Sequence, residues 1–248
     1  MSLHLSNNLL YSQSLSNLPN KKLLISTLNA YSFNIAQSDT IFQMALQQSD
    51  VLLPDGISVV LATYLLSGQR LKKIAGEDLF LYEMNKLNSQ PHNPVKGELR
   101  SNKVFFLGSN EVVLAKIKAR AAIEFPFVEV HTYSPPYKSE FSEEENKVLL
   151  DVINAVKPDI LFVGMTAPKQ EKWAYQHFTE LQAGHVCCIG AVFDFYAGTI
   201  QRAPQWMINI GLEWFYRLIK EPGRMWKRYL IGNVKFVWYV LREKFSNV

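Results

Sequence analysis

The chain has 248 residues, of which 48% are hydrophobic and 19% charged, and its formal net charge is +4. This composition excludes a mainly disordered or collagen-like protein, and the length suits one large domain or one domain with an appendage. The only two cysteines, Cys187 and Cys188, are adjacent, so within a strand they point to opposite faces. They form neither a metal-ligand pair nor a useful disulfide, and they indicate buried thiols in a reducing compartment.

Strand and helix patterns alternate along the first half of the chain. Strands are predicted at residues 22–28, ending near Asn29, and at 51–53, stopping at the turn Pro54-Asp55-Gly56. Helices are predicted at 40–48, after a cap at Ser38 or Asp39, and at 57–66 and 76–88. A segment near 89–102 lacks hydrophobic periodicity and contains two prolines, which is typical of a surface linker between two halves.

The second half repeats this alternation more regularly. Strands are predicted at 104–107, 127–132, 159–163 and 186–189, and Gly108, Gly164 and Gly190 follow three of them. Helices are predicted at 110–125, at 142–157 after a capping box, and at 168–181 with Pro168 in the favoured first position. Such alternation implies parallel strands with right-handed crossovers. The predicted fold class is therefore α/β, a Rossmann-like three-layer sandwich with a mainly parallel sheet.

The C-terminal region differs from the rest of the chain in charge and in aromatic content. Residues 202–248 contain nine Lys and Arg against three Asp and Glu, whereas residues 1–201 contain 17 against 19. The same region holds four of the five tryptophans, and its helical pattern is broken by Pro222. We therefore divide the chain into a polar N-terminal segment (1–20), an α/β core (21–203) and a basic, aromatic, helical appendage (204–248).

Ligands of open parallel sheets bind beyond the carboxyl ends of the strands, where Asn29, Asp55 and the three strand-end glycines are expected. One such glycine is most often an ordinary turn, but three in register favour a nucleotide-type ligand. The chain has neither Gly-x-Gly-x-x-Gly nor Gly-x-x-x-x-Gly-Lys-Ser/Thr. A dehydrogenase or a P-loop NTPase therefore has no positive support.

Two aspartates stand out. Asp55 lies between a strand and a helix, where a carboxylate can act as general base, although a cap or turn role is the commoner fate of Asp before Gly. Asp194 is flanked by aromatics and needs a partner if buried, for which Arg202 is a candidate. The five histidines are scattered and there is no Asp-x-Asp motif, so no metal ligands are evident.

Without a metal, a diphosphate ligand would need cations from the C-terminal region. The candidates are Arg202, Arg217, Arg224, Lys227 and Arg228. The spacing of Arg217, Arg224 and Arg228 places them on one helical face only if the helix continues through Pro222. The alternative interpretation is a solvated basic face.

Seven motifs, taken together, resemble the WecB/TagA/CpsF family of bacterial glycosyltransferases from about Ile25 to the C-terminus. In chain order they are residues 27–29 (TLN), 53–56 (LPDG), 76–79 (GEDL), 163–173 (VGMTAPKQEKW), 190–198 (GAVFDFYAG), 202–204 (RAP), and 211–218 (GLEWFYRL) followed by 221–224 (EPGR). Each motif is weak alone, but their order and spacing are highly specific.

The resemblance implies an inverting glycosyltransferase that needs no cofactor and no metal ion. The donor is a nucleotide sugar, typically a UDP-sugar, and the acceptor is a sugar linked to polyprenyl diphosphate at the inner membrane surface. N-acetylmannosamine, its uronic acid, glucose and glucuronic acid each fit some relatives, so the transferred sugar and the acceptor glycan stay open.

The resemblance also assigns roles to single residues. Asp55 matches the proposed catalytic base, and Thr27 and Asn29 match polar residues that line the same pocket. Gln170 matches a substrate-site position, and Arg217 and Arg224 match arginines thought to meet the diphosphate. Further substrate-binding candidates from the motifs and strand ends are Lys73, Gly108, Ser109, Gly164, Pro168, Lys169, Gly190, Asp194, Lys227 and Arg228. Lys73 stands where some relatives carry arginine, so it keeps the charge but loses the bidentate fork.

The aromatic and basic side chains of residues 206–245 suit a membrane interface. No run of about 18 apolar residues and no secretory signal is present, so we expect a cytoplasmic protein that associates peripherally with the inner face of the plasma membrane. Alternatively, the aromatics pack on the core or against another subunit, which leaves a homo-oligomer open.

Two rival functions come from other classes. A non-catalytic nucleotide-sugar sensor or assembly partner would keep the strand-end glycines without needing a base. A nucleic acid binder is disfavoured, because the positive charge is confined to one end and no recognition motif is present.

Overall fold

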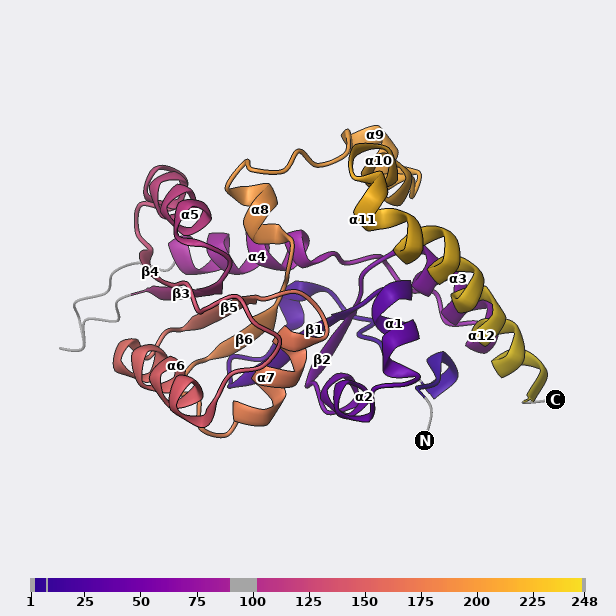
Figure 1. The fold of residues 1–248 in the computed structure, drawn as a ribbon, viewed down its shortest axis with the longest axis horizontal. Helices are drawn as coiled ribbons and strands as arrows, with labels where there is room; N and C mark the ends of the chain where they lie inside the picture. The colour runs from indigo at the N-terminus through magenta and orange to yellow at the C-terminus, as the bar shows by residue number, and fades with distance from the viewer. Residues whose placement is uncertain (1–2, 8, 90–101, 247–248) are drawn as a thin grey trace.

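Six parallel strands form one sheet in the part of the chain that the structure describes (Figure 1). The structure is a computed structural model and describes residues 3–7, 9–89 and 102–246, without the side chains of Asn209, Arg224 and Ser246. The strands follow the order β2-β1-β6-β5-β3-β4. They are β1 (Leu23–Leu28), β2 (Val51–Pro54), β3 (Lys103–Gly108), β4 (Glu129–Tyr133), β5 (Ile160–Gly164) and β6 (His185–Cys188). The predicted parallel sheet is confirmed.

Helices cover both faces of this sheet and give the predicted three layers (Figure 1). One face is covered by α4 (Gly76–Ser89), α5 (Glu111–Glu124) and α8 (Val192–Tyr196). The other face is covered by α6 (Glu143–Val156) and α7 (Lys169–His177), and further along by α1 (Ala30–Ala36), α2 (Thr40–Gln47) and α3 (Ile57–Ser67). Cys187 lies in the first apolar layer and Cys188 in the second, so the two thiols are buried on opposite faces as predicted.

Two short helices are not among the predicted elements. Helix α1 follows β1 directly and has only seven residues, and α8 has five. Neither segment is long enough for a helical period to separate it from a loop. Helix α7 ends at His177 rather than at the predicted residue 181, and the predicted linker lies largely outside the described residues, at 90–101.

The N-terminal segment is polar in composition, but its leucines are buried. It contains two 3-10 turns, η1 (Leu5–Asn7) and η2 (Leu15–Asn17). Leu3, Leu5 and Leu10 are each less than 5% exposed. They share one apolar cluster with α1, α2, α3 and the C-terminal helix, so this segment is part of the folded unit.

The appendage is a chain of helices that returns over the core (Figure 1). It consists of α9 (Gln205–Asn209), α10 (Glu213–Lys220), α11 (Pro222–Trp226), the π-helix η4 (Lys227–Ile231) and α12 (Gly232–Ser246). The predicted break at Pro222 is confirmed, since α10 ends at Lys220 and Pro222 opens α11. Helix α12 lies beside α1 and α3 (Figure 1). None of the helices in the described ranges is long and apolar enough to span a membrane.

Candidate active site

The predicted site residues of the core gather at one edge of the sheet. Because all strands are parallel, the residues that follow β1, β2, β3, β5 and β6 meet at their common carboxyl edge. Asn29 follows β1 and Asp55 follows β2, and these two strands are neighbours with Leu28 opposite Pro54. The pairing of β1 with β2 therefore brings together residues that are about 25 positions apart in the chain.

Asp55 is held at this edge by its backbone. Its N–H donates to the carbonyl oxygen of Leu28 at 2.9 Å, which fixes the turn against the end of β1. Gly56 has a φ of 135°, a conformation that favours glycine, and a side-chain carbon there would lie 3.6 Å from Cβ of Asn29. Asn29 caps α1 by accepting a hydrogen bond from the N–H of Ser32 at 3.0 Å. The turn after β2 and the cap of α1 thus lie next to each other.

Burial and surrounding charges raise the pKa of Asp55 to about 6. Loss of water around the carboxylate is the largest cause, and the negative charge of Glu213 adds to it. Lys73, Arg228 and Arg202 act in the opposite direction. The side chain still keeps part of its surface open to solvent. A carboxyl group with this pKa is ionised at neutral pH and remains basic enough to accept a proton.

Glu213 of α10 joins the appendage to the core beside Asp55. Its carboxylate lies 3.2 Å from Nε of Arg202 and 3.7 Å from Nζ of Lys73. Arg202 is also paired with Glu77 at the start of α4. The predicted pairing of Arg202 with Asp194 is therefore wrong, and Asp194 instead accepts a hydrogen bond from the hydroxyl of Thr199 at 3.0 Å. Asp194 lies in α8.

Two arginines of the appendage come together although the helix between them is broken. Burial lowers the pKa of Arg228, the positive charge of Arg217 lowers it further, and the negative charge of Asp55 acts in the opposite direction. The guanidinium carbon of Arg228 lies 4.3 Å from the ring centroid of Tyr31, and that of Arg217 lies 5.6 Å from Phe195. Nε of each arginine is buried and has no hydrogen-bond partner among the described residues. These N–H groups are suited to an anionic ligand.

Gln170 lies at the same edge of the sheet, under the loop that follows β6. Its side-chain oxygen accepts from the N–H of Met165 at 3.2 Å, and its side-chain nitrogen donates to Glu171 at 2.9 Å. A side-chain carbon on Gly190 would lie 3.4 Å from the Gln170 amide. Burial raises the pKa of Glu171 to about 7. The amide of Gln170 is thus oriented by two hydrogen bonds beside a strand-end glycine.

The other strand-end glycines are required by packing within the protein. Gly108 and Gly164 are register partners, and a side-chain carbon on Gly108 would lie 2.4 Å from the carbonyl oxygen of Gly164. A side-chain carbon on Gly164 would lie 2.8 Å from the ring of Phe193. Ser109 has a φ of 56° and donates its N–H to Gly164 at 3.3 Å. Close strand packing alone accounts for these two glycines, which weakens the argument that they indicate a nucleotide.

Several predicted residues lie apart from Asp55 or outside the description. Pro168 precedes α7, and Lys169 donates to the carbonyl of Lys138 at 2.6 Å and lies over the ring of Phe141, so it faces the segment before α6. Lys227 is exposed and lies over Trp226. Arg224 belongs to α11, but its side chain lies outside the described part of the structure. Thr27, by contrast, is buried in β1 opposite Leu53 of β2, two positions before Asp55.

Across the described ranges, no group of three or more His, Cys, Asp or Glu side chains is arranged to hold a metal ion. The histidines within the described ranges serve other contacts. His185, for example, pairs with Glu83 at 2.7 Å at the opposite, amino edge of the sheet. The absence of a metal requirement stays a prediction.

Sequence reasoning missed the partners that the appendage brings to the site. Glu213 lies within a recognised motif but received no role, and Tyr31 lies in the unpredicted helix α1. One signal was available, because only three acidic residues occur in the basic region 202–248, namely Glu213, Glu221 and Glu243. An acid retained in so basic a segment suggests a specific cationic or N–H partner.

Comparisons with known proteins agree with the resemblance seen in the motifs. The sequence profile of the glycosyl transferase WecG/TagA/CpsF family matches residues 6–248. A protein of Bacillus spizizenii is 31% identical over 225 residues, which cover 91% of this chain and 81% of the relative. A protein of Bacillus subtilis is 30% identical over 221 residues, covering 89% and 80%.

A Staphylococcus aureus protein is 29% identical over 216 residues, covering 87% of this chain and 76% of the relative. All three relatives are named N-acetylglucosaminyldiphosphoundecaprenol N-acetyl-beta-D-mannosaminyltransferase. The match extends over nearly the whole sequence and includes the turn, the strand ends and the appendage that form the site. The chain is a glycosyltransferase and belongs to the WecG/TagA/CpsF family.

Proposed function

We propose that this enzyme transfers N-acetylmannosamine, or a closely related sugar, from a UDP-sugar to an N-acetylglucosamine linked to polyprenyl diphosphate, with inversion at the anomeric carbon. The names of the relatives support this donor sugar and this acceptor class. One observation carries the proposal: a carboxylate with a pKa of about 6 lies at the carboxyl edge of the sheet among cations from both core and appendage. The arrangement suits a base beside a diphosphate site.

Asp55 acts as the general base in this mechanism. Its carboxylate takes the proton of the acceptor hydroxyl as the hydroxyl oxygen forms a bond to the anomeric carbon of the donor. The bond between that carbon and the β-phosphate oxygen breaks, and its electron pair leaves with UDP. Attack from the face opposite the leaving group inverts the anomeric configuration. Arg228 and Arg217 then stabilise the negative charge that develops on the diphosphate.

The donor can be identified by thermal unfolding with a panel of UDP-sugars. A ligand that binds only the folded state at 100 times its dissociation constant stabilises that state by about 2.7 kcal/mol. UDP-N-acetylmannosamine is expected to raise the unfolding temperature more than its uronic acid, UDP-glucose or UDP-glucuronic acid does. A larger shift with one of the other three would reassign the sugar and leave the rest of the mechanism in place.

Transfer is expected to continue in excess EDTA, because arginine and lysine side chains supply the positive charge that a metal ion supplies elsewhere. The measurement is UDP release with and without EDTA, followed by addition of Mg²⁺. Activity that EDTA abolishes and Mg²⁺ restores would contradict metal independence.

The acid limb of the pH profile is expected to depend on Glu213. A general base must be ionised, so kcat/KM should rise as the pH passes the pKa of Asp55, about 6. Replacement of Glu213 by Gln removes a negative charge that raises this pKa, so the limb should move to lower pH. Glu77→Gln is the matched control, because Glu77 also pairs with Arg202 but is not among the strongest influences on the pKa of Asp55. An acid limb that Glu213→Gln leaves in place would rule out this electrostatic coupling.

Helix α12 has the two faces expected of a peripheral membrane helix. Its inner face packs on the core through Phe236 and Val240. The opposite face exposes a stripe of apolar side chains, and basic side chains flank the stripe. The stripe is Val234, Val237, Trp238, Leu241 and Phe245, each 44–72% exposed, and the flanking cations are Lys235, Arg242 and Lys244. The inner face accounts for packing on the core, and the outer face supports the proposed membrane contact.

Helix α3 carries a second group of exposed apolar side chains. Ile57, Leu61, Tyr64 and Leu65 are 41–59% exposed and share one helical face. Helix α3 lies beside α12 (Figure 1). Since Ile57 follows Asp55 by two residues, docking of this surface on a bilayer would bring the base close to the lipid-linked acceptor.

Loss of two aromatics from the stripe is expected to weaken membrane binding at least tenfold. Burial of an aromatic side chain contributes about 1.5–3 kcal/mol, so Trp238→Ala with Phe245→Ala removes enough to be seen in sedimentation with anionic vesicles. Phe127→Ala is the control, because Phe127 is 59% exposed in a loop of the core. Equal vesicle binding by the double variant and the wild type would show that α12 is not the lipid contact.

A further inference from the structure

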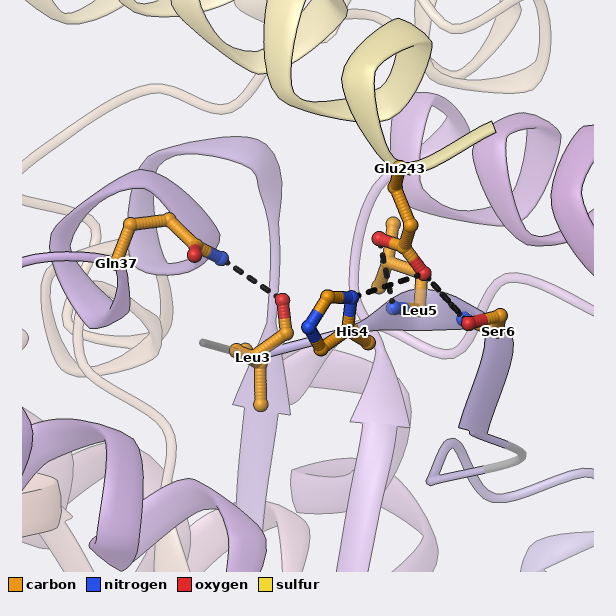
Figure 2. Close-up of polar contacts among 6 residues, drawn as sticks. All are labelled: Leu3, His4, Leu5, Ser6, Gln37 and Glu243. Atoms are coloured by element: carbon orange, nitrogen blue, oxygen red, sulfur yellow. Dashed lines mark hydrogen bonds and ion pairs between the residues drawn. The ribbon is translucent and has the colours of Figure 1, made fainter. Parts of the chain in front are cut away.

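The N-terminal segment and the C-terminal helix meet at one buried carboxylate, that of Glu243 (Figure 2). One of its oxygens accepts from the N–H of Ser6 at 2.9 Å and from the Ser6 hydroxyl at 2.7 Å. The other accepts from the N–H of Leu5 at 3.3 Å, and Nδ1 of His4 lies 3.7 Å from the carboxylate. These contacts join residues that are 237 and 238 positions apart in the chain.

This contact is not an incidental surface pair. Glu243 is 6% exposed and lies on the inner face of α12 together with Phe236 and Val240. A buried carboxylate is costly unless it is hydrogen-bonded, and here three donors from two residues satisfy it. The same short segment is held from the other side, where the side-chain amide of Gln37 donates to the carbonyl of Leu3 at 2.9 Å (Figure 2). Residues 3–6 therefore lie between α12 and the end of α1.

The contact is connected to the active site through α12 itself. Helix α12 continues directly from η4, which contains Arg228, an arginine whose charge acts on Asp55. At this end of α12 the side-chain amide of Asn34 donates to the carbonyl of Gly232 at 2.7 Å. Helix α1 contains both Asn34 and Tyr31, whose ring Arg228 covers. The appendage is thus fixed to α1 near the site and to residues 3–6 at the far end of α12.

We propose that residues 3–6 form a clasp that holds the appendage closed over the active site, with Glu243 as the positioning residue that keeps Arg228 beside Asp55. The proposal rests on the proposed role of Arg228 in binding the donor diphosphate. It assigns a function to the N-terminal segment, which the motifs left without one.

The clasp acts on an equilibrium between closed and open positions of the appendage. The outer face of α12 is exposed, so the helix is held to the core by its inner face alone. Loss of charge-assisted hydrogen bonds at one end lowers the closed fraction. If the donor binds only the closed form, the apparent dissociation constant of the donor rises in inverse proportion to the closed fraction. A saturating concentration of donor returns the appendage to the closed position.

A split between KM and kcat is therefore expected in the full-length enzyme. Glu243→Gln is expected to raise the KM for the UDP-sugar on the order of tenfold and to leave kcat nearly unchanged. Ser6→Ala removes one of the three donors and should raise KM by less. Glu140→Gln, a substitution in an exposed loop, is the control and should change neither constant. Amide hydrogen exchange should increase in residues 3–7 and 222–246 of the Glu243→Gln variant and stay constant in the strands.

A covalent cross-link in place of the Ser6–Glu243 contact tests whether a raised KM comes from displacement of the appendage or from loss of folded enzyme. Both native cysteines are buried, so a Ser6→Cys, Glu243→Cys variant can be joined by a short bifunctional thiol reagent. The variant should show a raised KM before cross-linking and a KM near that of the wild type afterwards.

Two results would overturn the clasp. One is a Glu243→Gln enzyme with wild-type KM and wild-type exchange in the appendage. The other is a double-cysteine variant whose kcat is lowered at constant KM and is not restored by cross-linking, which would indicate loss of folded enzyme. If instead Arg228→Ala leaves the donor KM and kcat at their wild-type values, the proposed role of Arg228 fails, while the exchange measurement still reports on the clasp.

Discussion

Replacement of Asp55 by asparagine is expected to lower turnover by several orders of magnitude while donor binding is largely kept. Asparagine fills the same space at the end of β2 but cannot take a proton from the acceptor hydroxyl, and loss of a general base typically costs roughly 10²–10⁴-fold in rate. The measurements are kcat with a lipid-linked acceptor and the thermal shift produced by the UDP-sugar. Near wild-type transfer by this variant would remove Asp55 from the mechanism.

Thermal unfolding supplies the control for that experiment. The folded-state pKa of Asp55, about 6, lies above its ordinary value of 3.8. The ionised carboxylate therefore destabilises the folded state, beginning as the pH rises above 3.8 and reaching its full extent above 6. Asp55→Asn removes this effect, so the variant should unfold at a slightly higher temperature than the wild type at pH 8. Asp151→Asn, an exposed change in α6, should affect neither activity nor stability.

Truncation after Glu221 is expected to leave a folded core with little transferase activity and weaker binding to anionic vesicles. The truncation removes Arg228 from the neighbourhood of Asp55 and the whole apolar stripe of α12. It also uncovers Phe33, whose ring packs on Phe236 at 5.3 Å, so the unfolding temperature of the truncated protein should fall. Circular dichroism, UDP release and vesicle sedimentation test the three parts separately. Vesicle binding equal to that of the full chain would show that residues 222–248 are not the membrane contact.

A single substitution in the full chain tests how much of the activity lost on truncation is due to Arg228 alone. Arg228→Ala should lower transfer by about 10²-fold or more, because a donor aimed at the developing charge is lost. Lys116→Ala is the control, since Lys116 is an exposed cation of α5 and belongs neither to the site nor to the apolar stripe. The account of the appendage fails if the two variants have the same activity.

The sheet could be predicted from the sequence because its strands are local signals. Apolar runs such as residues 104–107 and 159–163 end at glycines and alternate with helical patterns, which fixes parallel pairing without knowledge of distant contacts. The position of Asp55 followed from the same local information, a turn between a strand and a helix. The break in the appendage at Pro222 was equally local, since proline lacks the N–H that a continuing helix requires.

The charged partners could not be predicted because they depend on long-range packing. Glu213 meets Lys73 across 140 positions, and Glu243 meets Ser6 across 237. Hydrophobic periodicity does not specify which residues meet when they are so far apart in the sequence. The arginines show the same limit, because Arg217 and Arg228 come together through the folding of separate helices and not through a shared helical face. The family motifs predicted that arginines of the appendage reach the site, whereas the residues of the core that hold the appendage there could not be predicted.

The most direct test is the product formed by the purified enzyme from UDP-N-acetylmannosamine and an N-acetylglucosamine linked to polyprenyl diphosphate in vesicles. UDP release and the lipid-linked product are measured together, with Asp55→Asn as the inactive control. We expect stoichiometric UDP and lipid-linked disaccharide that form only when the acceptor is present, with inverted anomeric configuration. Donor binding without UDP release would contradict the account and indicate a nucleotide-sugar sensor, and UDP release independent of acceptor would contradict the proposed transfer.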